Sequence, residues 1–195
     1  IVFLNSDGEV EIGKELLQRR NEKYAEAIVN FLVNHLFPAL ENQMGEGKSV
    51  KIGIITPYNN QLCTIYKYLK KHGLEKNKCI KVGTVHSFQG EEADIIIFDT
   101  TDVDIYPSQL ITDKKLINVA LSRAKELLII VGSKNYLTNP KYFKEDIRQI
   151  YKRIIEEGEM FVKGRLILFL FFHWSKNFLY FTKFKMASWF KRIFR

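Results

Sequence analysis

Nine residues, from Thr84 to Glu92, bring together side chains that could bind a phosphate and a sugar. The segment reads TVHSFQGEE, so two hydroxyls, an imidazole and an amide follow a strand-like run. Neutral donors of this kind bind phosphate oxygens without a positive field. Gly90 would let the backbone approach a ligand closely, and Glu92 could accept hydrogen bonds from a ribose hydroxyl pair. The same composition suits a surface loop that only caps a strand, so the residues alone leave both interpretations open.

A second candidate is the guanidinium of Arg123, near the end of the segment NVALSRAK. Helical spacing would direct Val119 and Leu121 inward and leave Arg123 at the edge of the domain. A guanidinium is always charged and presents a planar fork that matches phosphate oxygens. An arginine that contacts a transferring phosphoryl group raises its rate by roughly 10³ to 10⁵. The alternative is that Arg123 or Lys125 is a solvated cation, favoured by the dipole at a helix C-terminus.

The elements that would position these residues are strands alternating with helices. The apolar runs are nearly uniform, which is typical of parallel strands covered on both faces. Such an order favours βαβ units with right-handed crossovers, and therefore an open α/β sheet. The predicted strands are Ile1–Leu4, Val50–Thr56, Ile80–Val85, Asp94–Thr100 and Leu127–Val131, and the predicted helices are Asn21–Leu40, Asn59–Lys71, Lys114–Lys125 and Lys141–Glu157.

Ligands of open α/β sheets bind beyond the carboxyl ends of the strands. The polar segments that follow or flank predicted strands are Thr56–Gln61, Thr84–Glu92 and Thr100–Pro107. We therefore expect these segments to include the site.

Length and composition indicate one compact domain with an extension. The chain has 195 residues, of which 46% are hydrophobic, enough to bury a substantial core. We place the domain at residues 1–158 and a tail at 159–195. The two cysteines, Cys63 and Cys79, are too few for a disulfide framework and favour a reducing compartment, with both thiols filling the core. Because the chain opens on Ile1 and goes directly into apolar residues, we expect the natural protein to continue upstream.

The positive charge is concentrated in the tail. The net charge is +8, but residues 165–195 hold seven basic and no acidic side chains, which leaves +1 for residues 1–164. Bulk charge therefore gives no argument for nucleic-acid binding by the domain, and such an argument must rest on individual residues.

Three segments resemble, in order and spacing, motifs IV, V and VI of superfamily 1 helicases. They are IGIITPYNNQ (52–61), TVHSFQGEEADIII (84–97) and NVALSRAKELLIIVG (118–132). The resemblance is strongest to the branch with the nonsense-mediated-decay RNA helicase and the replication nuclease-helicases, and it covers about residues 1–137. It implies the second, C-terminal RecA-like motor domain of an ATP-dependent helicase, with a parallel sheet flanked by helices as in phosphate-loop NTPases.

The resemblance also implies a role for individual residues. Arg123 would be the arginine finger that reaches the γ-phosphate of ATP. Glu92 and Gly90 would contact the sugar side of the nucleotide, and Gln89 would relay the nucleotide state to the nucleic-acid groove. Six residues would lie along the backbone of the single strand: Thr56, Pro57, Tyr58, Thr84, His86 and Ser87.

The chain departs from the family at the segment RRNEKYAEA. Glu22 follows Asn21 where some members carry a second phosphate-reaching arginine, and Tyr24 replaces the usual glutamate. Arg19 or Arg20 could substitute from the preceding positions, and we take Arg20 as the candidate for a γ-phosphate contact. The alternative is a solvated helix start.

No phosphate loop of the form Gly-x-x-x-x-Gly-Lys-Ser/Thr occurs in the 195 residues. The segment EGKSV has the wrong glycine spacing and reads as a turn. Asp99, Asp102 and Asp104 follow a predicted strand, and we expect them to form a solvated loop, because the family holds its metal in the first domain. ATP and Mg²⁺ would therefore be held mainly by an N-terminal RecA-like domain.

Two functions follow from that absence. In the first, the chain is half of a motor whose partners are single-stranded DNA or RNA and the N-terminal RecA-like domain, and it is inactive alone. In the second, it is a non-enzymatic nucleic-acid or protein-binding module from a degenerate or stand-alone helicase half. Either protein would work in the cytoplasm, or in the nucleus of a eukaryote.

The tail combines eleven aromatic residues with the seven cations of residues 165–195. Its longest apolar run, LILFLFF at 166–172, is too short to cross a bilayer. Three interpretations stay open: a terminal helix that packs on the domain or its partner, an interfacial helix on an anionic membrane surface, and an accessory nucleic-acid contact.

Overall fold

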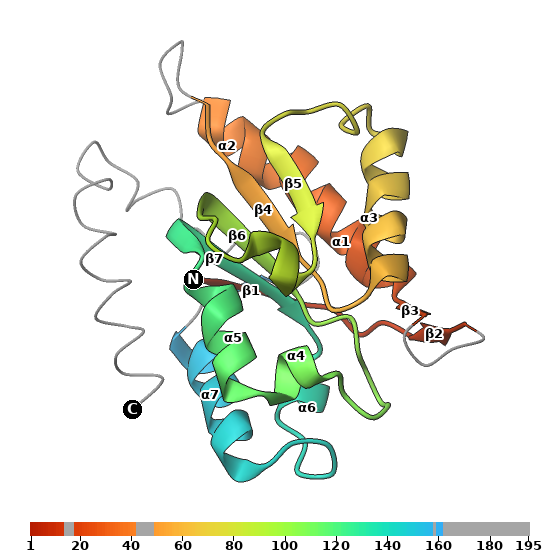
Figure 1. Ribbon diagram of the computed structural model, residues 1–195, viewed down its shortest axis with the longest axis vertical. Coiled ribbons are helices and arrows are strands. Elements are labelled where there is room, and N and C mark those ends of the chain that lie inside the picture. The colour runs from red at the N-terminus through yellow and green to blue at the C-terminus, as the bar shows by residue number, and fades with distance from the viewer. Residues whose placement is uncertain (14–17, 42–48, 158, 162–195) are drawn as a thin grey trace.

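The computed structural model describes residues 1–13, 18–41, 49–157 and 159–161. Its centre is a sheet of six parallel strands in the order β5-β4-β6-β7-β1-β8 (Figure 1). The strands are β1 (Val2–Asn5), β4 (Ile52–Ile55), β5 (Ile80–Gly83), β6 (Ala93–Asp99), β7 (Ala124–Gly132) and β8 (Glu159–Phe161). A separate two-stranded hairpin consists of β2 (Glu11–Ile12) and β3 (Arg19–Arg20).

Helices cover both faces of this sheet. They are α1 (Glu22–Phe31), a π-helical turn (Leu32–Leu36), α2 (Phe37–Glu41), α3 (Asn59–Lys71), a 3-10 turn (Val85–Phe88), α4 (Gln109–Thr112), α5 (Lys114–Leu121), α6 (Lys134–Leu137) and α7 (Glu145–Glu157). The predicted RecA-like α/β fold with a parallel sheet is confirmed. All five predicted strands are present, and β8 extends the sheet to Phe161, beyond the expected domain end at residue 158.

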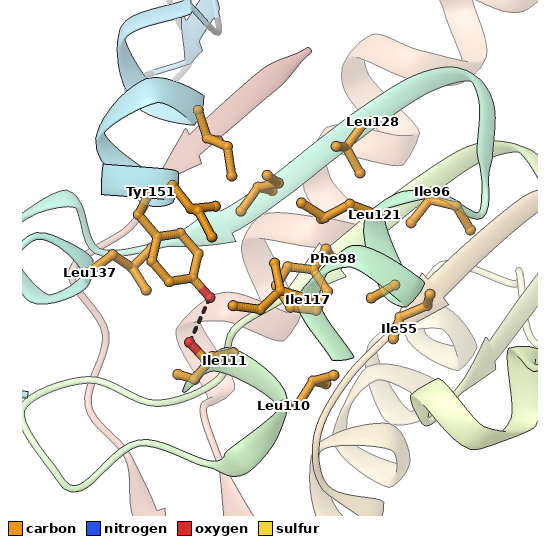
Figure 2. Packing of buried hydrophobic residues seen from close by; sticks show 14 of the residues in the cluster. Ile55, Ile96, Phe98, Leu110, Ile111, Ile117, Leu121, Leu128, Leu137 and Tyr151 are labelled. Atoms are coloured by element: carbon orange, nitrogen blue, oxygen red, sulfur yellow. Dashed lines mark hydrogen bonds between the residues drawn. The ribbon is translucent and has the colours of Figure 1, made fainter. Parts of the chain in front are cut away.

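Alternate strand residues divide the core between the two faces. On one face, α1, the π-helical turn and α3 pack on residues such as Ile54, Ile97 and Ile129. On the other, α4, α5, α6 and α7 pack on residues such as Phe98 and Ile130. Figure 2 shows this second layer, in which the Tyr151 hydroxyl donates a hydrogen bond of 3.0 Å to the carbonyl oxygen of Ile111. Burial on both faces explains why the strand sequences are apolar throughout.

The long helix predicted at Asn21–Leu40 is present but interrupted. Asn21 is its N-cap, and the Asn21 side chain accepts a hydrogen bond from the backbone N–H of Tyr24. A π-helical turn at Leu32–Leu36 then separates α1 from α2. Pro38 lies in the first turn of α2 and has no N–H to continue an α-helical ladder, which accounts for the change in register before it.

The helix predicted at Lys114–Lys125 is too long by four residues. Asp113 caps its start, accepting hydrogen bonds from two backbone N–H groups, and α5 ends at Leu121. Ala124 already belongs to β7, so Arg123 lies in the turn between α5 and β7. The last predicted helix also starts later, at Glu145 in place of Lys141. Sequence periodicity does not detect these boundaries, because Ala124 and Phe143 continue the apolar spacing of the neighbouring helices.

The described residues contain no helix that is long and apolar enough to cross a membrane. Residues 162–195, which include nearly all of the predicted tail, lie outside the described residues. The three interpretations of that tail therefore stay predictions.

Candidate functional site at the two edges of the sheet

Two edges of the sheet carry the predicted site residues. We call the edge where the parallel strands begin the amino edge, and the edge where they end the carboxyl edge. Strands β6 and β7 begin level with each other, since Ala93 pairs with Ala124. Because β5 ends at the carboxyl edge and the parallel strand β6 begins at the amino edge, the segment between them crosses one face of the sheet. Within this segment, Val85 and Phe88 pack into the core.

The amino edge brings Arg123 next to the glutamine-glycine turn. The backbone N–H of Ala93 donates a hydrogen bond of 3.0 Å to the carbonyl oxygen of Arg123. Beside it, Lys125 and Glu92 form an exposed ion pair with 3.6 Å between Nζ and Oε2. The backbone of Arg123 therefore lies beside the glycine turn and Glu92, which are the residues predicted to contact a nucleotide.

Gly90 has the backbone conformation that a glycine permits most easily. Its φ angle is +81°, and an added Cβ would meet nothing within 4 Å. The turn around it is exposed from Gln89 to Glu92. Open space and a left-handed backbone together leave room for a ligand to approach the main chain.

The guanidinium of Arg123 is satisfied within its own helix end. Its Nε donates to the carbonyl oxygen of Val119 at 3.0 Å, and its Nη2 donates to Ser122 Oγ at 3.3 Å. A cation is favoured at this C-terminus because it complements the helix dipole. A contact with a phosphate would require the half-buried side chain to rotate away from Val119.

The carboxyl edge buries two of the three predicted residues of the motif IV segment. Thr56 Oγ1 lies 3.1 Å from Thr101 Oγ1, and both residues are fully buried. The Tyr58 hydroxyl donates to Asp102 at 3.0 Å and accepts from Arg19 at 2.9 Å. Burial raises the pKa of Tyr58, with the Asp102 charge as the next cause. Of these three predicted residues, Pro57 is the one that is partly exposed.

The predicted motif V residues lie along the crossing segment. Thr84 follows β5 at the carboxyl edge and is partly exposed, whereas His86 and Ser87 are exposed in the 3-10 turn. The Ser87 hydroxyl donates to the carbonyl oxygen of Thr84 at 2.7 Å, so it is used locally. Their roles on a nucleic acid stay predictions.

Arg20 does not come near Arg123. It lies in the exposed hairpin, where its Nε and Nη2 donate to Glu11 at 3.0 and 2.6 Å, and this hydrogen bonding raises the pKa of Arg20. The neighbouring Arg19 contacts residues beyond the ends of β4 and β6, which places the hairpin at the carboxyl edge. At about 3.3 Å per residue, β7 alone separates the two edges by roughly 25 Å. Within this domain, the two arginines therefore cannot contact one phosphate.

The prediction of a solvated acidic loop after β6 is wrong for Asp99 and Asp102. Both are completely buried, while Asp104 is exposed. Asp99 accepts hydrogen bonds from Gln61 Nε2 at 2.7 Å and from the Thr101 backbone at 2.8 Å. Burial is the largest influence and raises the pKa of Asp99 to about 7. Gln61 lies almost forty positions away, so its contact with Asp99 could not be read from local sequence.

The residue that sequence reasoning missed is Arg19 as a buried structural cation. Its Nη1 lies 3.1 Å from Asp102 Oδ1, and the side chains are 9% and 0% exposed. The same nitrogen donates to the carbonyl oxygen of Tyr106 at 2.6 Å. Desolvation opposes the charge of Arg19, but Asp102 outweighs it and raises the pKa of Arg19. The residues that flank the pair RR, Gln18 and Asn21, are polar, so nothing in the local sequence indicates that Arg19 is buried.

Known proteins resemble this chain over most of its length. A family model described as an AAA domain matches residues 1–135. Helicase sen1 of Schizosaccharomyces pombe is 31% identical over 160 residues, which are 80% of this chain and 9% of the relative. An ATP-dependent helicase of Methanocaldococcus jannaschii, itself uncharacterized, is 30% identical over 160 residues, or 80% of this chain and 21% of the relative.

Regulator of nonsense transcripts 1 of Dictyostelium discoideum is 36% identical over 115 residues, or 56% of this chain and 9% of the relative. The chain thus spans about a tenth to a fifth of the length of these relatives. The resemblance to helicases that the three motifs predict is confirmed by these matches.

Proposed function

Because this chain belongs to the AAA domain family and its matched relatives are helicases, we propose that it is the C-terminal motor domain of an ATP-dependent helicase or translocase. Its amino edge would complete an ATP site held mainly by an N-terminal domain with a phosphate loop. Its carboxyl edge would form part of a groove for single-stranded DNA or RNA.

One observation carries the proposal. Arg123 lies beside the Gln89–Glu92 turn, although Arg123 and Gly90 are 33 positions apart in the sequence. The turn offers exposed backbone and a carboxylate for the sugar side of a nucleotide. The guanidinium offers charge for the phosphate that gains negative charge during transfer.

The residues of this chain fit the outer side of such a site and not its phosphate cradle. The donors gathered at the amino edge are a guanidinium, an amide and backbone N–H groups, and the 195 residues contain no phosphate loop. Mg²⁺ would neutralise phosphate charge from the N-terminal domain. We therefore expect the chain alone to hydrolyse no ATP.

The two edges give the proposed motor a route for coupling. The crossing segment (Thr84–Glu92) has Thr84 at the carboxyl edge and Gly90 at the amino edge. Its Val85 and Phe88 are buried between these two ends, so a shift of the segment at one end would move packed side chains that adjoin the other end. Closure of two domains on ATP and reopening after hydrolysis would then alternate the grip on a single strand.

The test is the turnover of ATP by the protein that joins this chain to a phosphate-loop domain. Arg123→Ala should lower the single-strand-stimulated kcat by at least about 10³, with the Kd for ATP within about twofold of wild type. Arg123→Lys should also be defective, because an ammonium lacks the planar fork. Arg153→Ala, at an exposed arginine of α7, is the matched control and should keep full turnover.

A purely structural Arg123 gives a different result. Its hydrogen bonds to Val119 and Ser122 would then be its whole role. Arg123→Ala would lower the free energy of unfolding slightly and leave kcat unchanged. That outcome would remove Arg123 from the mechanism, whereas a joined protein with no ATP turnover at all would favour a non-enzymatic binding module.

A further inference from the structure

The loop between β6 and α4 displays one aromatic side chain to solvent. Tyr106 is 83% exposed, against 51% for Ile12 and 38% for Tyr66, the other large hydrophobic side chains that are exposed among the described residues. Exposure of this degree leaves nearly the whole ring without packing partners. Its position at the carboxyl edge, next to the proposed groove, leaves the ring open to a ligand that lies along this edge.

The backbone beneath this ring is held by side chains from β3, from α6 and from the loop between α6 and α7. Three successive carbonyl oxygens accept hydrogen bonds: Asp104 from the Tyr142 hydroxyl at 3.1 Å, Ile105 from the Tyr136 hydroxyl at 2.7 Å, and Tyr106 from Arg19 Nη1 at 2.6 Å. The backbone N–H of Ser108 donates to Asp102 at 2.7 Å. The loop is therefore fixed before any ligand binds, and little backbone entropy remains to be lost.

The loop also adjoins the motif IV segment. Arg19 Nη1 donates both to the carbonyl oxygen of Tyr106 and to the hydroxyl of Tyr58, at 2.6 and 2.9 Å. Tyr58 is the aromatic residue that the sequence predicts for the single strand, but it is only 5% exposed and its hydroxyl is already bonded. Tyr106 is the aromatic side chain at this position that a base can reach.

We propose that Tyr106 stacks on an unpaired nucleobase of the single strand, a contact that rests on the proposed nucleic-acid groove. Every base has a π-face, so such stacking tolerates any sequence. A ring on a fixed loop loses little entropy when it binds, which suits a motor that must release and rebind each step.

Charge near the ring has a secondary role. Lys141 Nζ lies 4.8 Å from the centre of the Tyr142 ring. Hydrogen bonding to Tyr142 raises the pKa of Lys141, with smaller contributions from Asp104 and Tyr106. The ammonium can approach a phosphate beside the stacked base. The exposed Asp104 carboxylate partly offsets it, so stacking carries most of the binding.

The test measures the Kd of the full 195-residue chain for a fluorescent single-stranded oligonucleotide. Alanine substitution at a stacking aromatic weakens binding by roughly 5- to 150-fold, and we expect Tyr106→Ala to fall in this range. Tyr106→Phe keeps the ring and should bind within about twofold of wild type. Tyr66→Ala removes an exposed ring of α3 and should leave the Kd unchanged.

An oligonucleotide without bases distinguishes stacking from phosphate contact. Wild type should bind it more weakly, and Tyr106→Ala should weaken that binding no further. Equal losses on both oligonucleotides would overturn base stacking. Tight binding of the normal strand by Tyr106→Ala would overturn the proposal while leaving the groove intact, whereas no binding of any strand by wild type would contradict the groove itself.

Discussion

Removal of the Arg19 side chain should destabilise the domain strongly, because it would leave Asp102 charged and buried. The two side chains are 9% and 0% exposed, with 3.1 Å between nitrogen and oxygen. Loss of one partner from a buried ion pair costs about 3–5 kcal/mol. Asp102 keeps hydrogen bonds from Tyr58 and from the Ser108 backbone, so we expect Arg19→Ala near the lower end, about 3 kcal/mol.

Urea denaturation followed by circular dichroism measures this loss. With a slope of about 1–3 kcal/mol per molar urea, the midpoint should fall by about 1–3 M. The neighbouring Arg20 is the matched control, because its pair with Glu11 is exposed, and Arg20→Ala should lower the free energy of unfolding by at most about 1 kcal/mol.

The double variant Arg19→Met with Asp102→Asn removes both charges. It should recover part of the stability lost in Arg19→Ala, because no uncompensated charge stays buried. The reasoning fails if Arg19→Ala and Arg20→Ala have the same free energy of unfolding. It also fails if the losses of stability from Arg19→Met and Asp102→Asn simply add in the double variant.

Two further predictions concern a buried acid and a glycine. The pKa of Asp99 is about 7 in the fold against an ordinary 3.8, so its stabilising contribution is present at low pH and is lost as the pH rises through about 7. Between pH 4 and 8, wild type should therefore lose free energy of unfolding relative to Asp99→Asn, by at most about 4 kcal/mol. Parallel pH profiles of the two proteins would refute this prediction. Gly90→Ala and Gly73→Ala should each lower stability by about 1 kcal/mol, since both glycines have positive φ and open space. Only Gly90→Ala should slow ATP turnover in the joined protein, and equal turnover in both variants would remove the turn from the site.

Much of the fold could be predicted because the strands are buried on both faces. Runs such as Ile52–Ile55 are apolar throughout, and only a parallel sheet between helix layers requires that pattern. The predicted ends of helices and strands were less accurate, because each end depends on only a few residues of local sequence. Ala124 continues the helical spacing of Ala120 and Leu121, so the end of α5 and the start of β7 merge in the sequence.

The candidate site was predictable to the extent that short motifs contain its residues. The proximity of Arg123 to the turn at Gly90 follows from the resemblance and agrees with the structure. The burial of Asp102 could not be predicted, because Arg19 and Tyr58 lie 83 and 44 positions away. Such contacts depend on which strands become neighbours in the sheet, and the spacing of residues along the chain does not determine that order.

The central claim is that Arg123 stabilises charge that develops only during phosphoryl transfer. The most direct measurement compares the affinity of the joined protein for MgADP with its affinity for MgADP and tetrafluoroaluminate, which imitates the transferring group. We expect Arg123→Ala to weaken the tetrafluoroaluminate complex by about 10³ or more, with the ADP affinity within about twofold of wild type. Equal affinity of both proteins for the tetrafluoroaluminate complex would contradict the account.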